Sequence, residues 1–237
     1  MLEKLLSSSF FDTHGLLSSL AVQQKISFFI HAPSALIIAV FFFKDWFFLL
    51  QNYKTLYPYI ARIIGYSAIA NTITIAVYGI KHTLALNTQL FLPWGFVITM
   101  LLLLTLYWVK DRTEPMTWSK AIVVGLMQGC ALMPGISRFA ATYVAARWLG
   151  LSARRGMQVS FVVQFPLIAL ASVFGLVTMP RNVRDMLFSI QVMTVIVAAT
   201  FLAYLLLQWT YNLACAHKLQ RFSWYMVVPF LISLLLV

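Results

Sequence analysis

The feature that most constrains this chain is the recurrence of apolar runs long enough to cross a membrane. Such runs occupy residues 26–50, 59–80, 90–109, 158–177, 190–216 and 222–237. A helix needs about 20 apolar residues to cross a hydrocarbon core of roughly 30 Å, and it satisfies its own backbone polar groups there. We therefore predict an all-α polytopic membrane protein with about six membrane-spanning helices, in a single domain over residues 1–237.

The charge balance is strongly basic, with 17 Lys and Arg residues against 6 Asp and Glu and a net charge of +11. In a soluble protein this excess would indicate nucleic-acid binding. Here only 10% of the residues are charged and 62% are hydrophobic, and the basic residues lie mostly between the apolar runs. This favours membrane topology, in which cytoplasmic loops collect Lys and Arg. Attraction to an anionic ligand such as a lipid phosphate is a second, compatible interpretation. We expect a membrane partner and no nucleic acid.

Residues 121–151 interrupt the pattern of long runs. Two apolar pieces, 121–133 and 139–151, are each too short to cross the core, and Pro134, Gly135 and Arg138 separate them. A backbone break at membrane depth is tolerated where it is buried in protein or lines a watery cavity. We therefore predict a re-entrant helix hairpin over 121–151. The alternative is one unusually long, kinked helix over 121–150.

The distribution of basic residues favours the hairpin. If the hairpin returns to the side where it began, one face of the membrane carries the segments near 51–58, 110–120, 152–157 and 217–221. If residues 121–151 crossed the membrane fully, the excess of basic residues on one face would largely disappear. That face is predicted to be cytoplasmic, because it collects eleven basic residues against five. The eleven are Lys44, Lys54, Arg62, Lys110, Arg112, Lys120, Arg147, Arg154, Arg155, Lys218 and Arg221, and the five are Lys4, Lys25, Lys81, Arg181 and Arg184.

Arg138 is the residue that most needs a partner. An arginine inside a membrane segment is costly unless it is paired or solvated, and the few carboxylates of this chain lie in loops, helix ends or the N-terminal stretch. Its neighbours suit a phosphate ligand: Gly135 permits a tight turn, Ser137 is a good N-cap, and Thr142 lies four residues on, on the same helical face. Guanidinium, hydroxyl and helix N-terminal N–H groups match phosphate oxygens. The alternative is an arginine that binds carbonyls or extends to the interface.

The segment GLMQGCALMPGISRFAATYVAARWLGLSARRGMQVSFVVQFPLI, residues 125–168, resembles the second motif region of the undecaprenyl-diphosphate phosphatases of the BacA/UppP type. Their pattern is G-x-x-Q-x-x-A-L-x-P-G-x-S-R-S-G-x-T, then L-G-L-S and F-S-F-L-x-x-x-P. The segment 28–46 is similar to the family's early H-L-G-T-L-L-A-V helix. The second motif is matched at Gly125, Gln128, Ala131, Leu132, Pro134, Gly135, Ser137, Arg138, Thr142, Leu149 to Ser152, Ser160, Phe161 and Pro166.

The chain departs from S-R-S-G at Phe139 and Ala140. The added bulk beside the arginine would either narrow a diphosphate pocket or be accommodated by repacking.

The resemblance implies inverted repeats, each with a re-entrant helix pair, in a multi-pass protein of the bacterial plasma (inner) membrane. It implies hydrolysis of undecaprenyl diphosphate to undecaprenyl phosphate and phosphate, which recycles the lipid carrier of cell-wall synthesis. It implies catalytic roles for Ser137, Arg138 and Thr142. It implies substrate-binding roles for Gly135, Gln128 and His31. His31 equally suits a polar residue in a helix interface. A divalent metal ion, Mg or Ca, is implied by the resemblance alone, with no residue identified as its ligand. A homo-oligomer is compatible with the sequence.

The family's first motif, about E-G-x-T-E-F-L-P-x-S-S-T-G-H, has no match in this sequence. Relatives follow that motif with a stretch like L-x-L-L-E-K-L-L-G, which residues 1–8 (MLEKLLSS) fit. One interpretation is therefore that the chain lacks the N-terminal part of the first repeat. The other is a full-length chain whose half-site has decayed, with residues 7–15 as a remnant and His14 as its histidine. The alternative function is then non-hydrolytic polyprenyl-phosphate binding or transport on the same fold.

Overall fold

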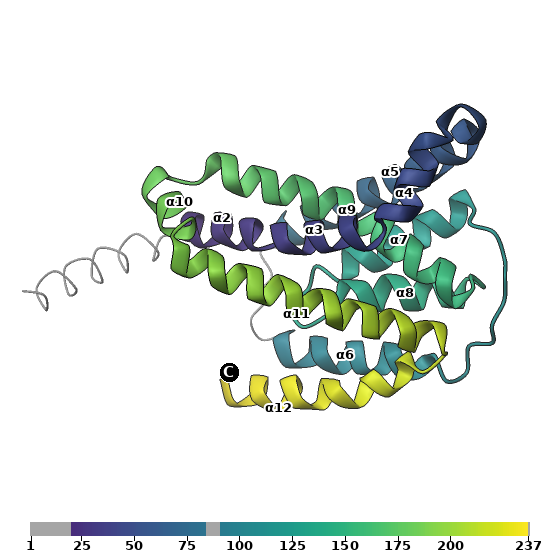
Figure 1. The fold of residues 1–237 in the computed structure, drawn as a ribbon. Helices are drawn as coiled ribbons and strands as arrows, with labels where there is room; N and C mark the ends of the chain where they lie inside the picture. Colours follow the sequence, from purple (N-terminus) through teal and green to yellow (C-terminus); the bar gives the residue numbers. More distant parts are fainter. Residues whose placement is uncertain (1–19, 84–90, 237) are drawn as a thin grey trace, which may run out of the picture. The chain divides into compact units, whose positions relative to one another are not determined.

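The structure, a computed structural model, describes residues 20–83 and 91–236 (Figure 1). Within these ranges it contains helices and turns and no strand, which confirms the predicted all-α class. The proposed motif remnant at 7–15, with His14, lies outside the described residues. The helices are α2 (Leu20–Ile30), α3 (Ala32–Phe41), α4 (Phe43–Gln51), α5 (Tyr53–Thr83), α6 (Leu92–Thr105), α7 (Trp118–Cys130), α8 (Arg138–Trp148), α9 (Ala153–Thr178), α10 (Arg181–Leu187), α11 (Ile190–Cys215), the 3₁₀ helix η2 (Leu219–Met226) and α12 (Val227–Leu236).

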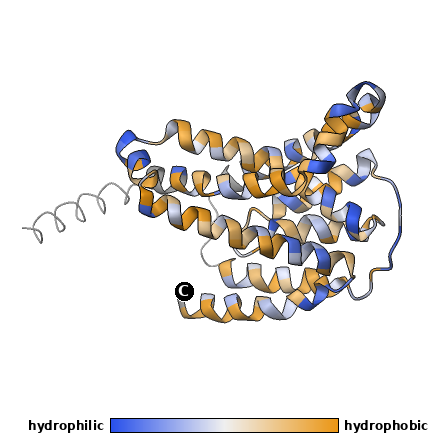
Figure 2. Cartoon of the chain, in the orientation of Figure 1, coloured by the Kyte–Doolittle hydropathy of each residue, from blue (hydrophilic) through white to orange (hydrophobic). Residues whose placement is uncertain are grey.

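Three helices are long and apolar enough to cross a membrane, over Tyr53–Ile80, Ala153–Thr178 and Ile190–Cys215. Apolar residues cover the helices along most of their length, and hydrophilic residues gather at helix ends and loops (Figure 2). The protein is therefore a multi-pass membrane protein, as predicted.

The count of six spans is not confirmed. The run at 26–50 is interrupted at Phe42, between α3 and α4, so this pair supplies at most a fourth span. The runs at 90–109 and 222–237 form shorter apolar helices, Leu92–Thr105 and Leu219–Leu235. Hydropathy measures how apolar a run is, and it does not register a helix that ends without Pro or Gly.

The chain divides into two compact units, and each is described by itself. The first comprises residues 1–45 and 165–206. Its core is a cluster of Met179, Val183 and Leu187, against which Ile26 and Phe29 of α2 pack. The expected single domain over 1–237 stays a prediction.

The second unit comprises residues 46–164 and 207–237. Here α7 and α8 form a hairpin, α5 packs along α7, and α6 packs against α8, η2 and α12. The α5–α7 approach is close, because a Cβ atom on Gly125 would lie 2.7 Å from the Cα atom of Ala70. Ala70 also belongs to the buried cluster of this unit, together with Val124, Ala145 and Val163.

The hairpin returns to the end at which it begins. The loop at 110–117 precedes α7, and the turn at 149–152 follows α8. The backbone N–H of Glu114 donates to the carbonyl oxygen of Gly150 at 3.1 Å, and Nη1 of Arg147 lies 2.6 Å from Oδ1 of Asp111. These contacts give the predicted hairpin over 121–151 and exclude the single kinked helix.

The same end gathers three of the four segments that the hairpin prediction placed on one face. Asp111 joins them, since Nε2 of His217 lies 3.7 Å from its Oδ2 and Nη1 of Arg147 lies 2.6 Å from its Oδ1. Slight burial opposes ionisation of Asp111, but the hydrogen bond and charge of Arg147 outweigh it and hold the pKa of this carboxyl below its usual value. The hydrogen bond and charge of Lys120 likewise lower the pKa of Glu114.

The ion pair predicts a pH-dependent stability. Because the folded-state pKa of Asp111 is lowered, its contribution is present above the unfolded-state value of about 4 and is lost as the pH falls through the folded-state pKa. We expect Asp111→Asn to lower the free energy of unfolding at pH 7 by about 1 kcal/mol, since Asp111 is 47% exposed and screened by solvent. Thermal unfolding in detergent between pH 7 and pH 3 measures this.

The difference between the native protein and Asp111→Asn should shrink toward pH 3. Asp185→Asn, at an exposed carboxylate of α10, is the control and should cost little at any pH. An Asp111→Asn penalty that stays constant down to pH 3 would contradict a charged partner for Arg147.

Candidate functional site

The hairpin tip, residues 131–137, lies in backbone contact with α6. Gly135 has φ +81°, in the left-handed region that favours glycine. Opposite it is Gly95 of α6, where a Cβ atom would overlap the carbonyl oxygen of Pro134 and lie 2.8 Å from the Cα atom of Gly135. Glycine is required on both sides of this contact.

Thr99 of α6 fastens the tip. Its side chain is fully buried, and its hydroxyl donates to the carbonyl oxygens of Gly95 at 3.0 Å and Gly135 at 3.1 Å. The same oxygen accepts the backbone N–H of Ser137 at 2.9 Å. Thr99 thus supplies partners for two backbone groups of the turn that no helix satisfies.

Ser137 caps α8, as predicted. Its Oγ accepts the backbone N–H of Ala140 at 3.3 Å. Among the described residues, the backbone N–H groups of Arg138 and Phe139 have no hydrogen-bond partner. Two donors at the positive end of the helix dipole are therefore available to an anion.

The Arg138 side chain is partly buried at this helix start. Within the described ranges, no hydrogen bond or ion pair reaches its guanidinium group. By contrast, Arg147, nine residues further along α8, is paired with Asp111. A charge without a protein partner in a membrane hairpin suits an anionic ligand.

Thr142 lies one turn after Arg138, and its side chain faces inward. Its hydroxyl is fully buried and donates to the carbonyl oxygens of Arg138 at 2.9 Å and Phe139 at 3.2 Å. It also accepts from Nε2 of Gln164 at 3.1 Å. In this structure Thr142 therefore ties the first turn of α8 to α9.

Phe139, the bulky residue beside the arginine, packs against other aromatic rings. It stacks on Tyr143 at 5.7 Å and on Phe161 at 5.2 Å between ring centroids. The Phe139 ring is therefore packed between α8 and α9, and whether it narrows a diphosphate pocket stays a prediction.

Gln128 is held against α5 by its side-chain hydrogen bond and not at the tip. Gln128 is fully buried in α7, and its Nε2 donates to Oδ1 of Asn71 in α5 at 3.3 Å. Asn71 in turn donates to Ser67 at 3.3 Å, while Oε1 of Gln128 has no described partner. His31 precedes α3 in the other unit. The predicted substrate contacts of both residues stay predictions.

The residues at the tip do not fit a divalent metal ion. The described residues contain no group of three His, Cys, Asp or Glu side chains placed to bind one. A guanidinium group and backbone N–H groups are donors, whereas Mg²⁺ and Ca²⁺ take oxygen ligands. The divalent metal therefore stays an expectation from the resemblance alone, and no step below passes through it.

The family model described as "Bacitracin resistance protein BacA" matches residues 5–231. The chain belongs to the BacA family. The match includes α7, the tip and α8 and confirms the resemblance drawn from residues 125–168.

Three relatives of this BacA-family chain are named undecaprenyl-diphosphatase. "Undecaprenyl-diphosphatase" of Psychrobacter sp. (strain PRwf-1) is 29% identical over 187 residues, which cover 73% of this chain and 65% of the relative. "Undecaprenyl-diphosphatase 2" of Bacillus thuringiensis (strain Al Hakam) is 30% identical over 127 residues, or 53% and 47%. "Undecaprenyl-diphosphatase" of Aliivibrio salmonicida is 34% identical over 116 residues, or 46% and 43%. The chain thus spans about half the length of most of these relatives.

Two residues that hold this BacA-family tip were not identified from the sequence, namely Thr99 and Gln164. Each is a polar residue inside an apolar run, which often marks a helix–helix hydrogen bond in membranes. That signal was present in the sequence, but it does not name the partner.

The contact between α6 and the tip gives a matched pair of glycine substitutions. We expect Gly95→Ala to destabilise the protein by about 1–3 kcal/mol, because the new methyl group displaces the carbonyl of Pro134. Gly79→Ala in α5 meets nothing within 4 Å and should be neutral or stabilising by up to about 1 kcal/mol. The measurement is the melting temperature of each variant in detergent. Equal melting temperatures of the two variants would show that Gly95 of α6 is not in close contact with the backbone of Pro134 and Gly135.

Proposed function

We propose that this chain carries the diphosphate-binding half of an undecaprenyl-diphosphate phosphatase in the bacterial inner membrane. The reaction is cleavage of the phosphoanhydride bond of undecaprenyl diphosphate by water, which gives undecaprenyl phosphate and inorganic phosphate. The observation that carries the proposal is the partly buried guanidinium of Arg138, without a described partner, at the start of α8 in the BacA-family hairpin. The names of the relatives supply the substrate class. They give no support to the alternative of non-hydrolytic binding or transport.

In this proposal, the tip neutralises and orients the diphosphate. Arg138 makes a two-pronged contact with phosphate oxygens. The N–H groups of Arg138 and Phe139 donate to the same phosphoryl group. Ser137 uses its oxygen to cap α8, and its hydroxyl proton is directed to a phosphate oxygen. Charge that develops on the bridging and terminal oxygens is thus met by donors that are already in place.

Thr142 has a positioning role in the proposal. Its hydroxyl is buried and bonded to two carbonyls and Gln164, so it holds the turn that presents Arg138. Gly135 allows the backbone to turn so that the helix start faces the ligand. The hydrogen bonds of Thr99 to Gly135 and Ser137 hold the turn and the start of α8 in place.

The test is phosphate release from undecaprenyl or farnesyl diphosphate by the purified chain, with binding of the lipid measured in parallel. We expect Arg138→Ala to lower release by roughly 100-fold or more, in line with loss of a preorganised charge donor. Arg138→Lys should also be strongly impaired, because lysine cannot make the two-pronged contact.

Arg154→Ala removes the same charge at an exposed position of α9 and should leave release and binding unchanged. Near-normal release by Arg138→Lys would exclude Arg138 as the phosphate clamp. A native chain that neither binds nor cleaves the diphosphate would overturn the proposed function.

A further inference from the structure

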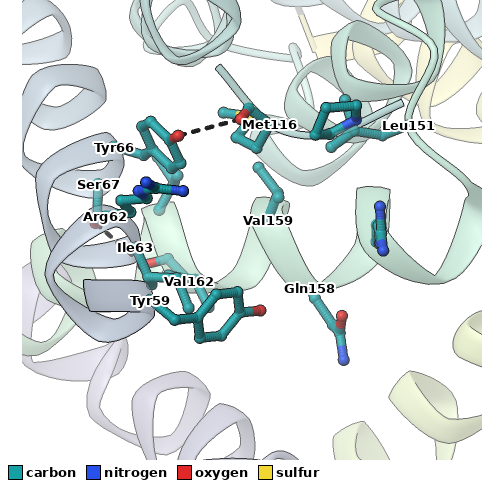
Figure 3. A pocket seen from close by; sticks show the side chains of 13 residues that line it. Tyr59, Arg62, Ile63, Tyr66, Ser67, Met116, Leu151, Gln158, Val159 and Val162 are labelled. Carbon is teal, nitrogen blue, oxygen red and sulfur yellow. Dashed lines mark hydrogen bonds between the residues drawn. The ribbon is translucent and has the colours of Figure 1, made fainter. Parts of the chain in front are cut away.

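A second site, separate from the hairpin tip that carries Arg138, lies on another face of α9. A pocket of about 310 Å³ opens between the first half of α5, residues 115–116 of the loop and the first turns of α9. In Figure 3, Arg62 and Tyr59 extend from α5 toward the side of Val159. The pocket lies wholly within the second unit of the chain.

The charge of this pocket is uniformly positive. Two arginines, Arg62 and Arg155, line it, and none of the lining residues is acidic. Both arginines are exposed, and neither forms an ion pair with a described residue. Arg155 makes one long hydrogen bond, 3.4 Å, to the carbonyl oxygen of Thr113. The two acidic side chains of the adjoining loop already have partners, Glu114 at 2.7 Å from Nζ of Lys120 and Asp111 at 2.6 Å from Nη1 of Arg147.

Most of the remaining wall is apolar, although Ser67 and Gln158 also line it. Ile63, Met116, Val159 and Val162 line the pocket from three elements. Two guanidinium groups beside an aliphatic wall match a molecule with an anionic head and a hydrocarbon tail.

Aromatic residues lie at and beside this pocket, as is typical of segments near lipid headgroups. Tyr59 and Trp118 are exposed, and the Tyr66 ring meets the Trp118 ring edge-on at 4.5 Å. The Tyr66 hydroxyl donates to the carbonyl oxygen of Met116 at 3.1 Å, which fixes the loop against α5. Tyr and Trp gather at membrane–water interfaces, and α5 and α9 are both long and apolar enough to span.

The pocket is separate from the tip that carries Arg138. Residues 155, 158, 159, 162 and 163 of α9 line it. Phe161 and Gln164, the two residues of α9 that contact Phe139 and Thr142 near the start of α8, lie on the other side of the helix at 100° per residue. A ligand here therefore does not occupy the diphosphate site.

We propose that this pocket binds an anionic phospholipid of the surrounding membrane. Its phosphate is held by Arg62 and Arg155, and one acyl chain lies along Val159 and Val162. The inference does not rest on the proposed enzymatic function, because it uses neither Arg138 nor the hairpin tip. The bound lipid braces the first half of α5 against the start of α9.

The experiment compares Arg62→Gln/Arg155→Gln with Arg154→Gln. Arg154 is the neighbouring exposed arginine and does not line the pocket. Native mass spectrometry counts phosphatidylglycerol molecules retained by purified protein, and thermal unfolding measures stabilisation by added phosphatidylglycerol. We expect the native protein and Arg154→Gln to retain one tightly bound phosphatidylglycerol, and the double variant to bind it roughly tenfold or more weakly. Phosphatidylcholine should not replace it.

Further arms distinguish the source of the phosphate. After removal of bound lipid, equal melting temperatures of the native protein and the double variant in neutral detergent show that the double variant is folded. Glycerol phosphate at millimolar concentration should not displace the lipid. Displacement by it would make the ligand a soluble phosphate, and tighter binding of undecaprenyl phosphate would make the pocket a prenyl-lipid site. Either result, or equal retention of phosphatidylglycerol by all three proteins, overturns the proposal.

Discussion

The hydrogen bonds of Thr99 are the interaction on which the hairpin depends. A turn inside a membrane exposes backbone groups that neither water nor lipid can satisfy, so neighbouring protein must supply their partners. Thr99 does so for the carbonyl of Gly135 and the N–H of Ser137 with one hydroxyl group. This works only because Gly95, one turn earlier in α6, leaves room for the backbone of the tip. A short helix that does not itself reach across the membrane thereby supports the break between α7 and α8.

Once the turn is fixed, the start of α8 has a defined direction. Ser137 closes the helix end, Thr142 bonds back to the first turn and to Gln164, and the Phe139 ring stacks on Phe161. Two neighbouring helices therefore hold Arg138 from both sides, while its guanidinium group makes no described polar contact of its own. A charged group that is held by its backbone and left without a partner is preorganised for a ligand, because little rearrangement is needed when the ligand binds.

Local signals in the sequence were sufficient for the hairpin and its cap. The short apolar pieces, Pro134-Gly135 and Ser137 predicted two helices and their junction, and the structure has α7, α8 and the Ser137 cap in those places. The partners could not be predicted, because Thr99 lies 36 residues from Gly135 and Gln164 lies 22 residues from Thr142. The interruption at Phe42 was also hidden, since no Pro or Gly marks it. Periodicity and breakers report on neighbours in the chain, whereas a membrane site is assembled from helices that meet in space.

The arginines of the second unit show how one side chain serves three physical roles. Arg147 is buried and already paired with Asp111, so its role is to stabilise the end of the hairpin. Arg62 and Arg155 are exposed in the pocket that we propose for an anionic lipid, whose headgroup would balance their charge. Arg138 is partly buried, without a carboxylate among the described residues and beside free helix N–H groups. Net charge would treat all four alike. The burial of each arginine and its bonding partner decide whether it stabilises the fold, contacts a lipid or binds a substrate. An unpaired charge costs more free energy the further it lies from water.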